Sequence, residues 1–125
     1  MARVRTRDTD LEQLVRSELH RRGFRFRKHL KSLPGCPDLV LSRPKIAVFI
    51  DGDFWHGYRL PKWEKRLQPF WRAKIRRNRQ RDRNNFRKLR RRGWRVIRLW
   101  QHELKGDLDA SIRRITSLLD TTRGD

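Results

Sequence analysis

The sequence predicts an α/β domain in which a central mixed sheet is flanked by helices. Two observations indicate this fold. Segments with helical apolar spacing alternate with short strand-like runs, and the continuous apolar run at residues 46–50 suits a central strand covered on both faces. With 125 residues, the chain is long enough for one domain with a real core. We expect a basic N-terminal arm at residues 1–8, a single domain at residues 9–120 and a tail at residues 121–125.

The first half of the chain is predicted to form one helix followed by three strands. A capping box opens the helix at Thr9, apolar residues follow at helical spacing, and Gly23 ends it. Phenylalanines that alternate with arginines predict a half-buried strand at residues 24–27. Residues 38–41 and 46–50 form the next two strands, since prolines and glycines mark turns before and between them.

The second half is predicted to form a long helix, a strand and a final helix. Residues 58–69 show no regular pattern and are expected to be an irregular, mobile loop. An apolar stripe among many lysines and arginines predicts a helix from about residue 70 to residue 92. Residues 94–100 are rich in apolar and aromatic side chains, as in a strand, and residues 108–119 have the spacing of an amphipathic helix.

The charge of the chain indicates a nucleic-acid partner. Lysine and arginine number 34 against 14 acids, which gives a formal net charge of +20. A basic protein of a membrane surface or of the ribosome is the alternative. The single cysteine, Cys36, excludes an intramolecular disulfide and a multi-thiolate zinc site. No apolar run approaches the roughly 20 residues that span a bilayer, so we expect a cytoplasmic, DNA-associated protein without membrane contact.

Two aspartates are candidates for a divalent-metal site. Asp38 begins one predicted strand and Asp51 ends the next. If these strands pair antiparallel, both carboxylates reach the same edge of the sheet. Mg²⁺ prefers such oxygen ligands, and hydrolysis of a phosphodiester needs a Lewis acid of this kind. The alternative is that both aspartates are turn residues.

Three further features add to this candidate site, each with a simpler alternative. Asp82 falls on the apolar stripe of the long helix, where a carboxylate must be functional or paired, for example with a neighbouring arginine. His56 can ionise near neutral pH as a general base should, although a loop histidine is more often inert. Phe54 and Trp55 can pack into the core or unstack base pairs as a wedge.

Taken together, these segments resemble the very-short-patch-repair (Vsr) endonucleases, a family of the restriction-endonuclease-like, PD-(D/E)XK-type superfamily. The resemblance covers about residues 6–104. The matching stretches, in order, are Thr6-Arg7-Asp8-Thr9 with Glu12, Leu33-Pro34-Gly35-x-Pro37-Asp38, Val48-Phe49-Ile50-Asp51-Gly52-x-Phe54-Trp55-His56-Gly57, Phe70-Trp71-x-x-Lys74-Ile75, Arg77-Asn78-x-x-Arg81-Asp82-Arg83, and Gly93-Trp94-Arg95-Val96 with Trp100.

The resemblance implies a restriction-endonuclease-like fold and a Mg²⁺-dependent endonuclease that nicks one strand of duplex DNA beside a T·G mismatch. Asp38 would be the principal metal ligand, together with the main-chain carbonyl of Ile50. His56 would activate the attacking water with the help of Asp82. The other implied positions are Asp51 and Glu12 in the active site, the aromatic wedge of Phe54, Trp55 and Trp71, and an N-terminal arm with Arg3, Arg5 and Arg7 that clasps DNA.

The chain departs from the family at the structural zinc site. Asp53 and Tyr58 stand where relatives have zinc-binding cysteines, and His102 remains at a ligand-like position. Two thiolates are therefore missing, and we predict that structural zinc is absent. The following loop would then depend on packing of Trp63 and Leu67, or stay mobile until DNA binds.

Two other functions remain open from the sequence. One is a nuclease of the same superfamily with relaxed or structure-based specificity, and the other is a non-catalytic basic DNA-binding protein. The joint presence of Asp38, Asp51, His56 and Asp82 favours an enzyme over the second alternative. We expect a monomer.

Overall fold

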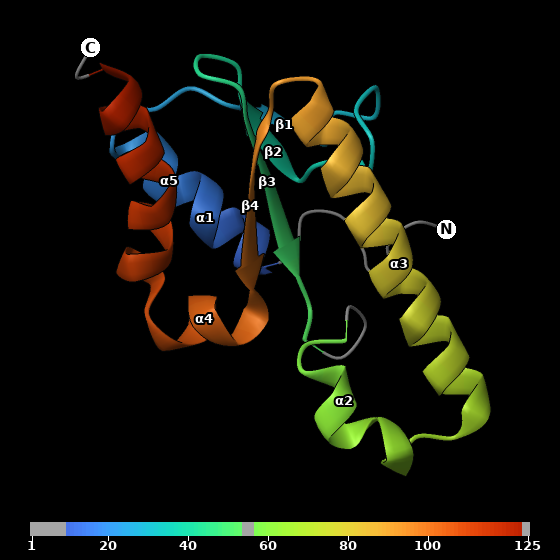
Figure 1. The fold of residues 1–125 in the computed structure, drawn as a ribbon. Coiled ribbons are helices and arrows are strands. Elements are labelled where there is room, and N and C mark those ends of the chain that lie inside the picture. Colours follow the sequence, from blue (N-terminus) through green and yellow to red (C-terminus); the bar gives the residue numbers. More distant parts are fainter. Residues whose placement is uncertain (1–9, 54–56, 124–125) are drawn as a thin grey trace.

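The computed structural model describes residues 10–53 and 57–123, and it has a central sheet with helices on both sides (Figure 1). Helices α1, α4 and α5 lie on one side of the sheet, and α3 lies on the other. The elements are α1 (Asp10–Arg21), β1 (Arg27–Lys28), β2 (Leu39–Leu41), β3 (Ile46–Asp51), α2 (Leu60–Trp63), the 3-10 helix η1 (Glu64–Arg66), α3 (Pro69–Arg91), β4 (Arg95–Trp100), α4 (Gln101–Gly106) and α5 (Leu108–Arg123).

The sheet is mixed, as the sequence predicts. Its four strands lie in the order β1-β2-β3-β4. Strands β1, β2 and β3 pair antiparallel, whereas β4 pairs parallel with β3. A parallel connection needs a long crossover, and α3 provides it between β3 and β4. The prediction of an α/β fold with a central mixed sheet flanked by helices is confirmed, and this fold is consistent with a restriction-endonuclease-like architecture.

The core is divided by β3, whose six residues are all buried. Alternate side chains of this strand point to opposite faces of the sheet. Ile46, Val48 and Ile50 belong to a large apolar cluster with residues of α1 and α5. Ala47 and Phe49 belong to a smaller cluster with residues of α3. The apolar run at residues 46–50 is therefore a strand covered on both faces, as predicted.

Two local expectations were wrong. Strand β1 contains Arg27 and Lys28, while Phe24 and Phe26 precede it and pack, partly buried, against the larger apolar cluster. The segment 58–69, expected to be irregular, contains α2 and η1. Leu60 explains why this segment is helical rather than irregular. Its side chain is only 1 % exposed, and its burial holds the short helix against the rest of the domain.

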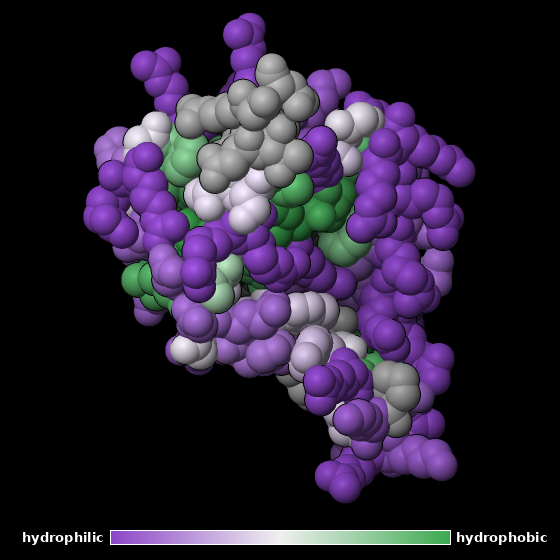
Figure 2. All heavy atoms as spheres, turned by 60° about the vertical axis from the view of Figure 1, so that its left-hand side comes forward, coloured by the Kyte–Doolittle hydropathy of each residue, from purple (hydrophilic) through white to green (hydrophobic). Residues whose placement is uncertain are grey.

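The surface is strongly hydrophilic, and Figure 2 shows such side chains over most of one face. Long α3 contributes many of the basic residues, since arginines and lysines fill the positions between its few buried side chains. None of the helices in residues 10–53 and 57–123 combines the length and apolar character that crossing a bilayer requires.

Candidate active site

The hairpin of β2 and β3 brings Asp38 beside the C-terminal end of β3. Leu39 pairs with Val48 in this antiparallel ladder. The Asp38 side chain then accepts a hydrogen bond from the backbone N–H of Ile50, with 2.6 Å between Oδ2 and the nitrogen. Asp38 is 3 % exposed. The predicted antiparallel pairing, which carries Asp38 to the same edge as the end of β3, is confirmed.

Asp38 forms a compact group with Glu12 of α1 and His29, which follows β1. We call these three residues the acid–histidine group. Each offers one ligand atom, and the three atoms lie within 4.8 Å of one another. Glu12 is buried, and the His29 side chain is 12 % exposed. The backbone N–H of His29 donates to the Asp38 carbonyl at 3.0 Å, which holds the two residues side by side at the end of the β1–β2 ladder.

The acid–histidine group fits a divalent cation. Ligand atoms that surround one ion at about 2.0–2.3 Å are themselves about 3–4.5 Å apart, which is compatible with the 4.8 Å limit of this group. An ionised carboxylate has about four acceptor positions, so the hydrogen bond from Ile50 is compatible with a metal on Asp38. Two carboxylates match the oxygen preference of Mg²⁺, and an imidazole suits transition-metal ions.

His29 was not predicted as a site residue from the sequence. Its ring reaches the site only because β1 pairs with β2 beside Asp38 and α1 packs nearby, and neither contact has a local signature. The single available signal was a histidine close before the Leu33-Pro34-Gly35 turn.

Asp51 and Asp82 meet elsewhere, on the two sides of one arginine. Arg98 of β4 donates from Nε to Asp51 Oδ2 at 2.8 Å and from Nη2 to Asp82 Oδ2 at 2.6 Å. We call these three residues the arginine-bridged group. Both carboxylates are buried, and the guanidinium lies 4.1 Å from the ring centre of Trp100. Burial lowers the pKa of Arg98, and the Asp82 carboxylate opposes that change. An arginine nevertheless stays protonated in proteins.

This arrangement contains the ion pair that the sequence left open for Asp82. Asp82 is buried on the sheet-facing side of α3, as its position on the apolar stripe predicts. It forms an ion pair with an arginine, which was the structural alternative. Asp51 lies at the predicted end of β3 but is not a member of the acid–histidine group.

The segment that carries the predicted base and wedge is anchored where its described residues begin and end. Asp53 Oδ1 lies 2.9 Å from Nδ1 of His102, and the backbone N–H of Tyr58 donates to the Asp53 carbonyl at 2.9 Å. The Tyr58 ring packs 4.4 Å from His102 and 5.0 Å from Trp100, measured between ring centres. The positions that the family resemblance assigns to zinc therefore form a polar and aromatic cluster here. Trp63 supports it through a 2.9 Å hydrogen bond from Nε1 to the Tyr58 carbonyl.

Gly57 lies against α3. It has a φ of +68°, and a Cβ atom there would lie 2.6 Å from Cδ of Arg79 and 2.9 Å from Cγ2 of Ile75. Both the conformation and the space demand glycine. The chain is thus held between α3 on one side and Trp100 and His102 on the other.

The remaining predicted DNA contacts are only partly described. Six predicted site residues lie outside the described part of the chain: Arg3, Arg5, Arg7, Phe54, Trp55 and His56. Trp71 is half-buried near the start of α3 and packs edge-on against Phe70, with 5.2 Å between ring centres. Phe70 is 64 % exposed, and the sequence analysis did not single it out although it follows Pro69 at the helix start.

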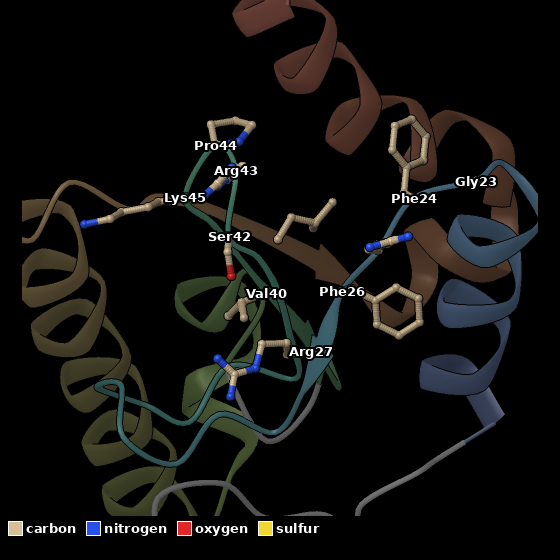
Figure 3. Close-up of a pocket in the computed structure, with 11 residues that line it drawn as sticks. Gly23, Phe24, Phe26, Arg27, Val40, Ser42, Arg43, Pro44 and Lys45 are labelled. Carbon is tan, nitrogen blue, oxygen red and sulfur yellow. The ribbon is translucent and has the colours of Figure 1, made fainter.

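A surface groove lies apart from these groups. It is lined by residues 23–27 and 40–45, around the turn that joins β2 to β3 (Figure 3). None of the predicted site residues lines it. Asp38 and its neighbours therefore lie at the opposite end of the β2–β3 hairpin from this groove.

Comparison with known proteins gives consistent matches. Residues 1–65 match the family described as DNA mismatch endonuclease Vsr. The type II nicking enzyme V.XorIIP of Xanthomonas oryzae is 43 % identical over 122 residues, covering 96 % of this chain and 89 % of the relative. The DNA mismatch endonuclease Vsr of Escherichia coli is 35 % identical over 122 residues, covering 96 % of this chain and 78 % of the relative. The type II nicking enzyme V.NmeAIP of Neisseria meningitidis is 42 % identical over 107 residues, covering 84 % of this chain and 76 % of the relative.

Proposed function

The chain belongs to the DNA mismatch endonuclease Vsr family, and on this premise we propose that it nicks one strand of duplex DNA beside a T·G mismatch, using Mg²⁺ held at Asp38. Membership in the family makes it a DNA endonuclease. The observation that carries the rest is the acid–histidine group, in which two buried carboxylates and an imidazole converge at one edge of the sheet.

Asp38 and Glu12 supply the carboxylates that hold the ion. A bound Mg²⁺ polarises the phosphoryl oxygens and stabilises the charge that develops on them. The Ile50 carbonyl is a suitable additional ligand, because the N–H and C=O of one strand residue face the same neighbour and the N–H of Ile50 already points to Asp38. The hydrogen bond between these two residues fixes the orientation of the Asp38 carboxylate.

His56 is the proposed base that takes a proton from the attacking water, since an imidazole has the required proton affinity near neutral pH. Asp82 is the proposed assistant, and Asp51 is a proposed second acid of the site with a weaker case as a metal ligand. The bridge through Arg98 supports a positional role for both acids, because one rigid guanidinium fork holds each carboxylate in a fixed orientation.

DNA binding is proposed to rest on charge and aromatic insertion. A net charge of +20 favours phosphate contacts, including those of an N-terminal arm with Arg3, Arg5 and Arg7. Phe54, Trp55 and Trp71 are the proposed wedge, and the exposed Phe70 beside Trp71 supports an aromatic surface at that point. We propose a monomer as the active species.

The experiment that tests this function is nicking of an end-labelled duplex with a T·G mismatch, compared with the T·A duplex. We expect Mg²⁺-dependent cleavage of one strand of the T·G duplex, none with EDTA, and much slower cleavage of T·A. Equal cleavage of both duplexes would remove the mismatch specificity and favour a nuclease with relaxed specificity. No metal-dependent cleavage of either duplex would overturn the proposal.

A further inference from the structure

The acid–histidine group contains a nitrogen donor that the proposed function does not use. His29 Nε2 lies 3.5 Å from Oε2 of Glu12. One ligand atom from each of His29, Glu12 and Asp38 lies within 4.8 Å of the other two. The three residues come from three separate segments: helix α1, the residue after β1 and the residue before β2. Tertiary packing, rather than local sequence, therefore brings the imidazole to the two acids.

We propose that His29 is a direct ligand of the ion at this site, so that the site binds Mn²⁺ through two carboxylates and one imidazole and prefers Mn²⁺ to Mg²⁺. This inference rests on the proposed function only in placing the ion at Asp38. It adds a ligand and a metal preference.

The spacing within the group is compatible with a ligand role for His29. Charge-assisted hydrogen bonds in proteins are about 2.7–2.9 Å long. In the arginine-bridged group, the contacts from Arg98 are 2.6 and 2.8 Å. Glu12 instead lies 3.5 Å from His29 and 3.5 Å from Arg16. The 3.5 Å spacing between Glu12 and His29 is one expected for neighbouring ligands of a single ion.

The chemistry of the donors determines the metal preference. Mg²⁺ demands hard oxygen ligands and loses its waters reluctantly, so an imidazole adds little to its binding. Mn²⁺ accepts carboxylates equally well and stands on the transition-metal affinity series for nitrogen and oxygen sites. A mixed set of two carboxylates and one imidazole therefore favours Mn²⁺. The backbone bond from His29 to the Asp38 carbonyl keeps the ring beside the acids before an ion binds.

Electron paramagnetic resonance of the full chain titrated with Mn²⁺ tests this inference without any measurement of activity. We expect pulsed spectra to show the ¹⁴N coupling of a directly bound imidazole. The His29→Asn variant should lose that coupling and bind Mn²⁺ about tenfold more weakly. Its Mg²⁺ affinity, measured by competition, should change by less than about twofold. Asparagine tolerates the positive φ of 47° at this position.

His20→Asn is the matched control, because His20 is an exposed histidine on α1. It should leave the coupling and both affinities unchanged. The chain has four histidines, so coupling that persists in the His20, His56 and His102 variants would identify His29 even if His29→Asn failed to fold. Mn²⁺ binding without ¹⁴N coupling, or coupling that survives in folded His29→Asn, would overturn the inference and leave the nicking function intact. Coupling through His29 in a protein that cleaves no DNA would instead overturn the proposed function alone.

Discussion

Two groups of buried acids lie around the end of β3, and they are neutralised in different ways. In the arginine-bridged group, Arg98 sits between two carboxylates at 2.6 and 2.8 Å. In the acid–histidine group, Glu12 lies 3.5 Å from both His29 and Arg16, and one ligand atom from each of the three members lies within 4.8 Å of the others. In the arginine-bridged group, the positive charge of Arg98 balances the two carboxylates. The acid–histidine group instead offers ligands of the types that bind a divalent ion.

The difference shows that buried acids of one domain can have different kinds of neighbours. A buried carboxylate must be paired or bound to a metal. Arg98 pairs two of the buried acids here, and we propose a metal ion for Asp38 and Glu12. Arg98 also packs over Trp100 and Phe86, at 4.1 and 5.3 Å from the ring centres. The arginine-bridged group therefore joins β3, α3 and β4 and orients its two acids, whereas we propose that the acid–histidine group holds the metal ion. Comparable substitutions in the two groups should therefore have different effects on cleavage and on stability.

The largest effect is expected for Asp38→Asn in the nicking assay. Asparagine can still accept the hydrogen bond from Ile50, but it cannot supply a carboxylate to the ion. Loss of several kcal/mol of transition-state stabilisation corresponds to a rate reduction of roughly a thousandfold or more. DNA affinity should stay equal or increase, because a negative charge near the phosphate is removed. If binding is lost together with cleavage, Asp38 has a structural role instead.

The next largest effect is expected for stability when Arg98 is replaced by methionine. This change leaves Asp51 and Asp82 buried without the cation between them, and breaking a buried pair in this way costs roughly 3 kcal/mol or more. Denaturant unfolding monitored by circular dichroism measures the loss. The control is Arg113→Met, which removes an exposed ion pair with Asp109 and should lower the free energy of unfolding far less. Equal losses in the two variants would show that the arginine-bridged group adds no more stability than a surface ion pair.

The sequence was sufficient to predict those features of both groups that depend on the spacing of apolar residues. The apolar run of β3 and the turn before it predicted the hairpin that carries Asp38 to Ile50. The stripe of α3 predicted that Asp82 faces the sheet. Both predictions follow from spacings that a single element repeats, and such spacings can be recognised without knowledge of the rest of the fold.

The partners of these acids could not be predicted, because they depend on tertiary register. Arg98 is one of 34 basic residues, and nothing in its neighbourhood distinguishes it before β4 is paired with β3 so that Arg98 lies opposite Phe49. His29 is similar, since its relation to Asp38 arises from the β1–β2 pairing. The short helix α2 was not predicted, because its formation depends on burial of one leucine, Leu60, rather than on a repeated apolar pattern.

A smaller effect is expected on the free energy of unfolding, and its sign should differ between the two groups. Asp51→Asn replaces a charged partner of Arg98 with a neutral one and should lower the free energy of unfolding by about 1–2 kcal/mol. Asp38→Asn in metal-free protein should leave that free energy unchanged or raise it, because a buried negative charge is removed from beside Glu12. Addition of Mg²⁺ should then stabilise the wild type and the Asp51 variant more than the Asp38 variant. Equal loss of Mg²⁺ stabilisation in both variants would restore Asp51 as a ligand.

The smallest global effect is expected at the pair of Asp53 and His102, which ties the start of the predicted wedge segment to α4. Both side chains are more than one third exposed, so Asp53→Asn should lower the free energy of unfolding by only about 0.5 kcal/mol. The local effect should be larger, because this contact and the packing of Tyr58 stand where the family resemblance places zinc. Limited proteolysis should therefore cut the chain beside Tyr58 several-fold faster in the variant, while Asp109→Asn, at a more exposed ion pair on α5, should leave that rate unchanged. Unchanged proteolysis in Asp53→Asn would mean that Gly57 and its contacts with α3 hold the segment alone.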